Sequence, residues 1–204
     1  MTEFWQDEIT NKSYIRLMEL KKEFDFVLIG GCAIYLHTKA YKSKDIDIII
    51  DYPQLTELKA KYNCNKNDFL KKYEIKEDHF DIDIYLPHYS DLSYPTEKIL
   101  QDFVIIDGFK VVNAEELVIL KQGAYTNRKG TIKGKKDSLD IVLILIHTNF
   151  DFKKYFEKIK TQKLENYKLQ LKEIIQSITD NDIQYLKIIR TDFLKRKKAY
   201  LSLL

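Results

Sequence analysis

The chain has 204 residues, of which 45% are hydrophobic, 13% aromatic and 32% charged. This length suffices for one mid-sized domain or for a compact domain with a helical extension, and the composition excludes an intrinsically disordered chain. The 34 basic and 31 acidic residues leave a net charge of only +3, which excludes a surface that is basic throughout and binds nucleic acid by charge alone.

The two cysteines, Cys32 and Cys64, stand far apart and have no companion Cys or His at metal-ligand spacing. We therefore expect no disulfide framework and a reducing, cytoplasmic setting. Residues 1–13 lack the basic and apolar regions of a signal peptide, and the apolar runs are far shorter than the ~18 residues of a membrane helix. We expect no membrane partner.

The first predicted elements are a helix, a strand, a turn and a second helix. Apolar residues recur at near-helical spacing from 9 to 24, which predicts an amphipathic helix. The apolar segment 26–29 predicts a short strand, which runs into a turn at Gly30 and Gly31. Residues 32–41 then predict a helix that leaves this turn.

Two acidic strands are predicted next. Residues 43–51 (SKDIDIIID) alternate carboxylate and isoleucine before they become continuously apolar, as in a strand that passes from a wet site into a core. Pro53 is expected to end this strand, and residues 54–73 are expected to be helical in two pieces. Residues 73–86 contain a second predicted alternating strand, HFDIDIYL.

Residues 103–112 (FVIIDGFKVV) predict a β-hairpin, because two apolar runs flank an Asp-Gly turn. Asn113 is expected to cap the next helix, with Glu116 in the position of a capping box. From Asp137 onward nearly all residues predict helix, including one segment with Asp180 as its expected cap. The predicted fold class is α+β: a mixed sheet flanked by helices in residues 1–147, then a helical extension in 148–204.

The Gly-Gly turn is suited to phosphate binding. Gly30 and Gly31 lack Cβ atoms, so backbone N–H groups can approach an anion, and the following helix presents its N-terminus there. Asp45 and Asp47 stand two residues apart on a predicted strand, so both carboxylates leave one face and can bind magnesium together.

A third carboxylate must come from elsewhere in the chain. Asp81 and Asp83 repeat the two-residue spacing on the second acidic strand, and either completes the set if the two strands are neighbours. We favour Asp83, because isoleucines flank it on both sides and the strand ends soon afterwards at Pro87. The spacing alone leaves Asp81 as the alternative.

The succession of GG, SKDIDI and IDIYL resembles the motifs of DNA polymerase β-like nucleotidyltransferases. The resemblance implies the polymerase β-like fold, with phosphate binding by Gly30 and Gly31. It also implies two Mg²⁺ or Mn²⁺ ions held by Asp45, Asp47 and Asp83, with Asp83 as the base. Many members carry Ser at the second turn position, where this chain has Gly31, so the resemblance says less about the substrate than about the chemistry.

The segment EELVILKQGAYTNRKGTIKGKKDSLDIVLIL is similar to the second half of AbiEii-type nucleotidyltransferases and their bacterial and archaeal relatives. That similarity implies that Lys121 contacts the nucleotide phosphates as a mobile point charge, and that Asp137 positions Lys121 or the acceptor hydroxyl. For Asp140 we favour a structural role. The basic residues of 128–136 are expected to form a loop. Expected or candidate nucleotide contacts also include Lys44, Arg128, Lys133 and Lys135. The motifs together span residues 26–145.

The implied activity is an enzymatic transfer of a nucleoside monophosphate from an NTP to a hydroxyl acceptor. By family analogy the acceptor is an RNA or tRNA end, as in toxin–antitoxin systems, and a cognate antitoxin is then a partner. The alternative is a catalytically idle, nucleotide-binding or antitoxin-like interaction protein of the same fold. A third candidate, an antibiotic-modifying transferase, needs an acidic acceptor pocket.

Overall fold

The structure is a computed structural model that describes the backbone of residues 3–204 and the side chains from Glu8 onward. The chain forms two compact units, Met1–Asn113 and Ala114–Leu204. This division falls earlier than the expected boundary at residue 147, because the helices on either side of residue 130 pack against each other and against later helices. The boundary of the functional domain stays a prediction.

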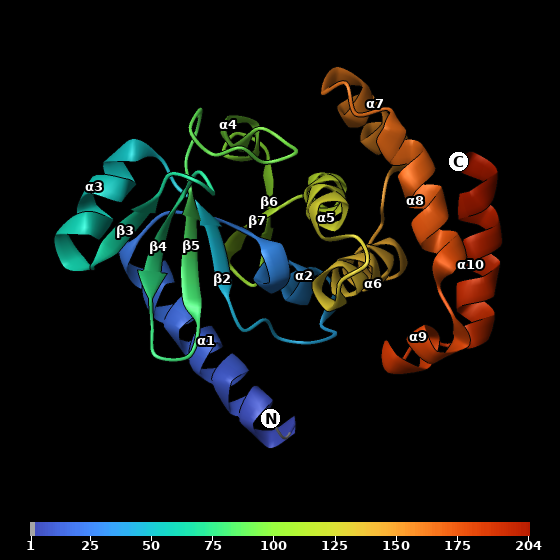
Figure 1. Ribbon diagram of the computed structural model, residues 1–204, viewed down its shortest axis with the longest axis horizontal. Coiled ribbons are helices and arrows are strands. Elements are labelled where there is room, and N and C mark those ends of the chain that lie inside the picture. The colour runs from blue at the N-terminus through green and yellow to red at the C-terminus, as the bar shows by residue number, and fades with distance from the viewer. Residues whose placement is uncertain (1–2) are drawn as a thin grey trace. The chain divides into compact units, whose positions relative to one another are not determined.

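The first unit is built on one seven-stranded sheet of order β3-β4-β5-β2-β1-β7-β6 (Figure 1). The strands are β1 (Val27–Ile29), β2 (Ile46–Ile49), β3 (Cys64–Asn67), β4 (Lys72–Lys76), β5 (Asp81–Tyr85), β6 (Phe103–Ile106) and β7 (Phe109–Val112). The helices are α1 (Glu3–Glu23), α2 (Gly30–Thr38), α3 (Tyr52–Lys61) and α4 (Thr96–Ile99). The pairs β1–β7 and β2–β5 are parallel and the others antiparallel, so the predicted mixed sheet is confirmed.

The two acidic strands lie side by side in the middle of the sheet because their isoleucines form one buried face. The fully buried members are Ile46, Ile48, Ile82 and Ile84. Helix α1 crosses the sheet (Figure 1): its Arg16 bonds Glu77 near β4, and its Lys21 bonds the Asp107 carbonyl between β6 and β7. The alternation along β2 and β5 therefore separates a core face from a polar face, as the sequence predicted.

The segment 54–73 was predicted wrongly. Only α3 is helical there, and Pro53 lies in its first turn behind the cap Asp51, which accepts a hydrogen bond from the Gln54 amide. The residues beyond α3 form the hairpin β3–β4, which extends the sheet beside β5. Strand β3 (CNKN) shows no apolar alternation because it is an edge strand, so its pairing, rather than its own pattern, makes it a strand.

Two turns of the first unit differ in how well they were predicted. The Asp-Gly hairpin turn is confirmed, and both Asp107 (φ 50°) and Gly108 (φ 74°) have the positive φ angles of a type I′ turn. At the Gly-Gly turn, α2 begins at Gly30 itself, so both glycines belong to the first turn of the helix instead of preceding it.

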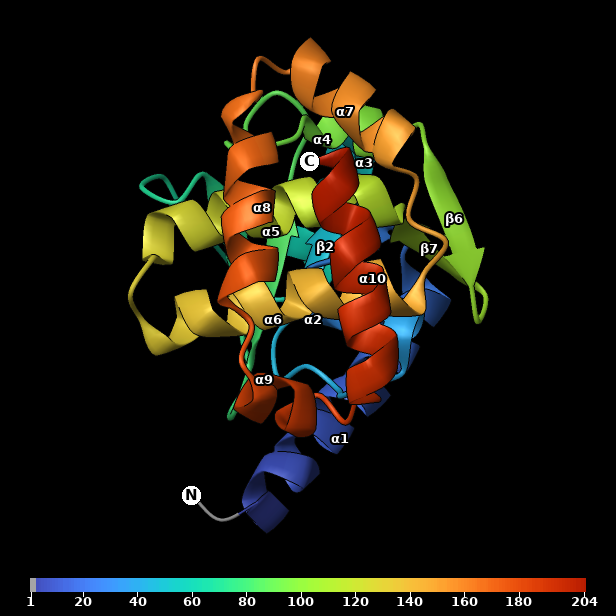
Figure 2. The ribbon, with the colours of Figure 1, turned by 90° about the vertical axis from the view of Figure 1, so that its right-hand side faces the viewer.

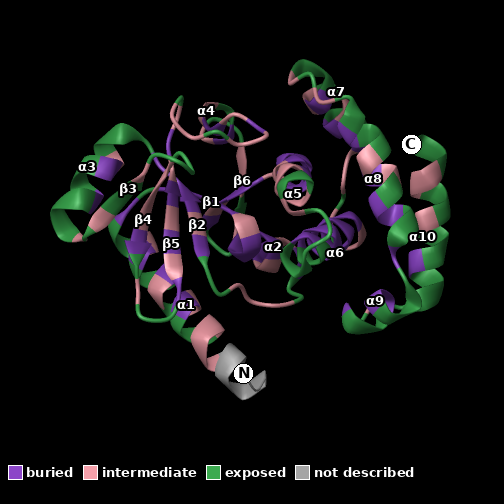
Figure 3. Cartoon of the chain, in the orientation of Figure 1, coloured by how far each residue is buried: buried purple, intermediate pink, exposed green. Residues whose placement is uncertain are grey.

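The second unit is entirely helical, which confirms the predicted helical C-terminal region (Figure 2). Its helices are α5 (Ala114–Arg128), α6 (Ile132–His147), α7 (Phe152–Thr161), α8 (Asn166–Ser177), α9 (Asp180–Tyr185) and α10 (Arg190–Leu203). Helices α8 and α10 run side by side (Figure 2), and both α7 and α8 pack on α5. Buried residues crowd the second half of α6, whereas one side of α10 is exposed (Figure 3).

Two boundaries in this unit were predicted wrongly. The expected basic loop 128–136 is mostly helix, because Thr131 caps α6 by accepting a hydrogen bond from the Gly134 amide at 3.0 Å. Helix α9 is capped by Thr179, which forms a reciprocal capping box with Asp182, so Asp180 is inside the helix. Across the described part of the chain, no helix combines the length and the apolar character that a membrane crossing requires.

Candidate functional site

Four aspartates lie on or next to two neighbouring strands, at the polar face of the sheet. Asp47 of β2 is directly opposite Asp83 of β5 in the parallel ladder. Asp45 precedes the first residue of β2 rather than lying on the strand, and its Oδ1 accepts a hydrogen bond from the Asp81 amide at 3.3 Å. The register thus pairs Asp47 with Asp83 and brings Asp45 beside Asp81. Both candidates for the third carboxylate, Asp81 and Asp83, are therefore close to the Asp45–Asp47 pair.

Asp83 is the more enclosed of these two candidates, with a side chain 15% exposed against 41% for Asp81. Its Oδ2 accepts a hydrogen bond from Lys72 Nζ at 2.6 Å. Its Oδ1 is buried and has no hydrogen-bond partner among the described residues. Burial raises the pKa of Asp83 and outweighs the opposing effect of Lys72.

Lys72 holds two carboxylates at once. Its Nζ also contacts Glu74 Oε1 at 2.9 Å, and Glu74 is directly opposite Asp83 in the β4–β5 ladder. Burial lowers the pKa of Lys72, but its hydrogen bonds to Asp83 and Glu74 outweigh this and leave the pKa raised. The Lys72 hydrogen bond lowers the pKa of Glu74, whose Oε1 also accepts from Asn67 Nδ2 at 3.2 Å.

The Gly-Gly turn touches this face. A Cβ atom on Gly30 would lie 2.1 Å from Oδ2 of Asp47, and one on Gly31 would lie 2.3 Å from Oγ of Ser43. The hydroxyl of Tyr85 lies 3.4 Å from Asp47 Oδ1 on the other side. The structure therefore brings together Gly30 and Asp47, which sequence reasoning had assigned to phosphate and to metal, respectively.

The start of α2 is suited to an anion. Its cap residue, Ile29, has no side-chain hydrogen bond to the first turn, so the N–H groups there lack the partner that a polar cap would give them. The N–H groups of a helix's first turn and the positive end of its dipole favour a phosphate at such a position.

The sequence analysis did not find Lys72, Glu74 or Tyr85. Tyr85 follows Asp83 by two residues, so the alternation that revealed Asp83 also places Tyr85 on the same face. Lys72 lies in the segment 54–73 that was expected to be helical. Glu74 lies just beyond it, before the expected strand HFDIDIYL, and no pattern indicated that these two residues pair with β5.

The described residues contain no group of three His, Cys, Asp or Glu side chains already converged on a metal position. The donor set nevertheless fits magnesium or manganese, since both prefer carboxylate oxygens and Asp83 Oδ1 is a buried oxygen without a partner. Lys72, at Asp83 Oδ2, supplies positive charge where an ion would.

The second unit holds the other predicted site residues in a buried cluster. Lys121 Nζ contacts Asp140 Oδ2 at 2.6 Å and Asp137 Oδ1 at 3.4 Å. The lysine is 9% exposed and Asp140 is fully buried. Lys121 and Asp137 are therefore neighbours, as expected, and Asp140 is a further charge partner of Lys121. In this structure the ammonium group of Lys121 is fixed by these ion pairs instead of being mobile.

Arg128 also reaches this cluster. Its Nη2 is 2.8 Å from Asp137 Oδ2, but not in hydrogen-bonding geometry, and Oδ2 is buried without a hydrogen bond in the described structure. Among the other expected phosphate contacts, Lys135 pairs with Asp182 at 2.7 Å, while Lys133 and Lys44 are exposed. Lys44 adjoins Asp45 in the first unit.

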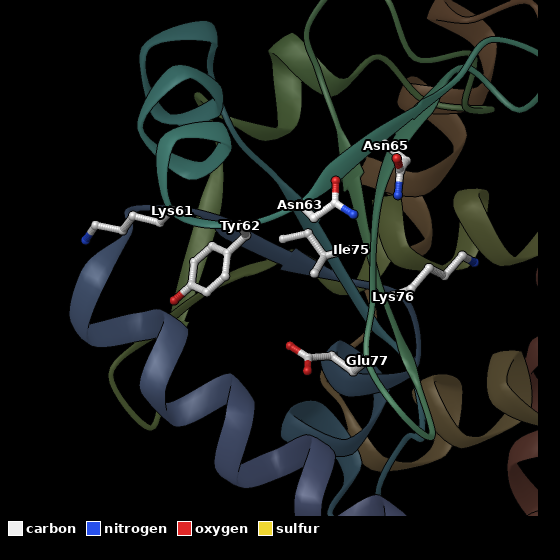
Figure 4. A pocket seen from close by; sticks show the side chains of 7 residues that line it. All are labelled: Lys61, Tyr62, Asn63, Asn65, Ile75, Lys76 and Glu77. Carbon is white, nitrogen blue, oxygen red and sulfur yellow. The ribbon is translucent and has the colours of Figure 1, made fainter.

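A pocket of about 260 Å³ opens at the end of α3, beside β3 and β4 (Figure 4). Its lining residues are Lys61, Tyr62, Asn63, Asn65, Ile75, Lys76 and Glu77, and none of them was expected in the site. Arg16 of α1 stacks on the Tyr62 ring at 4.7 Å and bonds Glu77 at 3.0 Å. Lys61, a third lining residue, also pairs with Glu23 of α1 at 3.3 Å, and Lys76 contacts Asp81 at 2.9 Å, so the lining adjoins both α1 and one of the four aspartates.

The fold is that of a nucleotidyltransferase-like protein. The chain is similar to the crystal structure of an antigenic nucleotidyltransferase-like protein from Paracoccidioides brasiliensis, with a TM-score of 0.50 and 16% identity over 95% of this chain and 93% of that one. Residues 9–191 match the family described as "Nucleotidyltransferase of unknown function (DUF6036)", and the chain belongs to this family. No curated protein matches it.

Proposed function

We propose that the chain is a metal-dependent nucleotidyltransferase that moves a nucleoside monophosphate from an NTP to a hydroxyl acceptor. One observation carries this proposal: Asp47 and Asp83 are directly opposite each other on neighbouring strands, and Gly30 at the start of α2 lies against Asp47. A carboxylate pair thus adjoins an anion-binding helix start, which is the combination that nucleotidyl transfer requires.

Asp45 and Asp47 are the proposed ligands of two Mg²⁺ or Mn²⁺ ions, with Asp83 as the third carboxylate. When bound, the ions neutralise the charge of the triphosphate. Asp83 is preferred to Asp81 because it is opposite Asp47 and has a buried oxygen without a partner.

The acceptor oxygen attacks the α-phosphorus, the bond from that phosphorus to the bridging oxygen breaks, and pyrophosphate leaves. The proton of the attacking hydroxyl passes to Asp83. Burial raises the pKa of Asp83, which makes its carboxylate a better proton acceptor than an exposed aspartate. The amides at Gly30 and Gly31 bind the triphosphate oxygens as the helix start of α2 receives the anion.

Lys121, Asp137 and Arg128 of the second unit are proposed, by the resemblance to AbiEii-type proteins, to act on nucleotide phosphates. Lys121 supplies positive charge to the phosphates, and Asp137 sets its position, as their 3.4 Å contact supports. Arg128 and Lys44 are proposed as further phosphate contacts. An RNA or tRNA end as acceptor, and an antitoxin as partner, follow from the resemblance to AbiEii-type proteins and are proposed on that basis alone.

The test is incubation of the purified chain with each radiolabelled NTP, Mg²⁺ and total cellular RNA, followed by a gel that resolves labelled RNA from labelled protein. The wild type should label one acceptor, while Asp47→Asn and Asp83→Asn should reduce labelling at least about a hundredfold, the usual scale for a catalytic carboxylate. The matched control is Asp25→Asn, since Asp25 is exposed and pairs with Lys110.

Labelling by Asp47→Asn at the wild-type rate would contradict the proposal. Magnesium-dependent NTP binding without labelling of any acceptor by the wild type would favour the alternative, an idle nucleotide-binding protein of the same fold.

A further inference from the structure

Lys72 is a largely enclosed cation on the polar face of the sheet. Its ammonium group lies between Asp83 Oδ2, at 2.6 Å, and Glu74 Oε1, at 2.9 Å. All three side chains are 12 to 15% exposed, so water screens the group only weakly. An ammonium ion so placed is a fixed part of the electrostatics at Asp83.

The two carboxylates need such a cation. Glu74 and Asp83 are directly opposite each other in the antiparallel β4–β5 ladder, where like charges destabilise the pair. Lys76 also contacts Glu74, at 3.4 Å, but its side chain is 55% exposed and its closer partner is Asp81, at 2.9 Å. Lys72 is therefore the main counterion of Asp83.

The contacts of Lys72 allow it to change partners. It occupies only Oδ2 of Asp83, and Oδ1 has no hydrogen-bond partner among the described residues. Asn67 also donates a hydrogen bond to Glu74 Oε1 and helps to hold this carboxylate in place, so Glu74 can retain the ammonium group when Asp83 no longer does. A cation that binds Asp83 would find one oxygen without a hydrogen-bond partner and would compete with Lys72 for the other.

We propose that Lys72 is a positioning residue that neutralises Asp83 in the absence of a divalent metal and yields this carboxylate to the metal, and that Glu74 retains Lys72 after the exchange. The inference rests on the proposed function, because it takes Asp83 as the third metal ligand. Beyond the proposed function, the inference assigns Lys72 and Glu74 the role of setting the affinity of the site for its metal ion.

The test is Mn²⁺ titration of the full-length chain, with the free Mn²⁺ read from its electron paramagnetic resonance signal. Lys72→Met removes the competitor and should lower the dissociation constant at least about threefold, while Glu74→Gln leaves Lys72 on Asp83 alone and should raise it by a similar factor. The matched control is Lys76→Met, on the same strand and bonded to Asp81, which should stay within about twofold of the wild type.

The thermal midpoint supplies a second measurement. Lys72→Met should unfold at a lower temperature than the wild type without metal and should gain more from added Mn²⁺, because tighter binding stabilises more. If Lys72→Met does not fold, the double variant Lys72→Met with Glu74→Gln removes both charges and should fold, with a higher Mn²⁺ affinity than Glu74→Gln, because the competing ammonium group is gone.

Each contrary result has its own meaning. Mn²⁺ binding by the wild type with unchanged affinity in Lys72→Met, or in the double variant relative to Glu74→Gln, would overturn the inference alone. An affinity gain in Lys76→Met instead of Lys72→Met would also overturn it and would assign the metal to Asp81. A wild type that binds no Mn²⁺ would overturn the proposed function and this inference with it.

Discussion

Gly30 lies so close to Asp47 that no side chain fits between them: a Cβ on Gly30 would be 2.1 Å from Asp47 Oδ2. The backbone at Gly30 also has a φ of +63°, which side-chain-bearing residues rarely adopt. The glycine is therefore required both by its conformation and by the carboxylate beside it.

Gly30→Ala should destabilise the chain by more than the strain of its φ angle. Gly130 provides the control, because its φ is +84° and no atom lies within 4 Å of its would-be Cβ. Gly130→Ala should lose about 1 to 2 kcal/mol of unfolding free energy from conformation alone, and Gly30→Ala should lose more, since Asp47 must also move. Urea unfolding measures both. Equal losses would show that the contact with Asp47 has no energetic effect.

Asp140→Asn should be among the most destabilising single changes in the second unit. The carboxylate is fully buried and lies 2.6 Å from Lys121 Nζ. Without its negative charge the buried ammonium group is only partly neutralised, so the unfolding free energy should fall by about 3 kcal/mol. Lys136→Gln is the control, because this lysine is 51% exposed at 3.5 Å from the same carboxylate and should cost under about 1 kcal/mol. Chemical denaturation that finds the two variants equal would contradict the buried pair.

Tyr155→Phe should cost about 1 to 2 kcal/mol of unfolding free energy. The Tyr155 hydroxyl is buried, donates to Gln122 Oε1 at 2.6 Å and lies 3.2 Å from the Tyr167 carbonyl, so the phenylalanine leaves buried acceptors with fewer donors. Tyr185→Phe, at a residue 69% exposed, should be neutral within about 0.5 kcal/mol. A neutral Tyr155→Phe in the same unfolding assay would show that these bonds add nothing.

Asp182 should make the stability of the second unit depend on pH in the acid range. Burial acts to raise the pKa of this carboxyl, but hydrogen bonds from Lys135 and from Thr179 outweigh it, and the pKa is lowered. Because the folded pKa lies below the unfolded value of about 3.9, the stabilisation is complete above that value and is lost as pH falls through the folded pKa.

Unfolding free energies measured between neutral pH and about pH 2 should therefore fall less steeply in Asp182→Asn than in the wild type. Asp180→Asn is a useful comparison: its carboxyl pairs with Arg190 but is 68% exposed, so screening should leave a smaller difference. Parallel pH curves for the wild type and Asp182→Asn would contradict the effect of the capping box.

The sequence was sufficient to predict the acidic strands, because isoleucine and aspartate alternate with the period of a strand and only one face of each strand is buried. It was also sufficient for the Asp107–Gly108 hairpin, whose turn type selects those residues. In both cases local geometry and burial point to the same structure, so the pattern can be read without knowledge of the partner strand.

The β3–β4 hairpin could not be read in this way. Strand β3 has no apolar alternation, and β4 has only one buried residue, Ile75. The two segments form strands because β5 offers an unpaired edge, a relationship that local sequence does not reveal. The pairing of Lys72 with Asp83 depends on that edge, so it was missed as well. The helix starts were also hard to locate from the sequence. Thr131 and Thr179 cap α6 and α9, but other residues that can cap a helix lie within a few positions of each.

The place of β4 in the sheet has a kinetic consequence for the carboxylates. Only the four-residue strand β3, at the margin of the sheet, lies outside β4, and marginal strands open to solvent more often than central ones. Asp47 and Asp83 stand on the interior strands β2 and β5, while the ammonium group that neutralises Asp83 is on β4. Amide protons of β3 and β4 should thus exchange with deuterium sooner than those of β2 and β5, and each opening detaches the counterion while the acidic ligands stay in register.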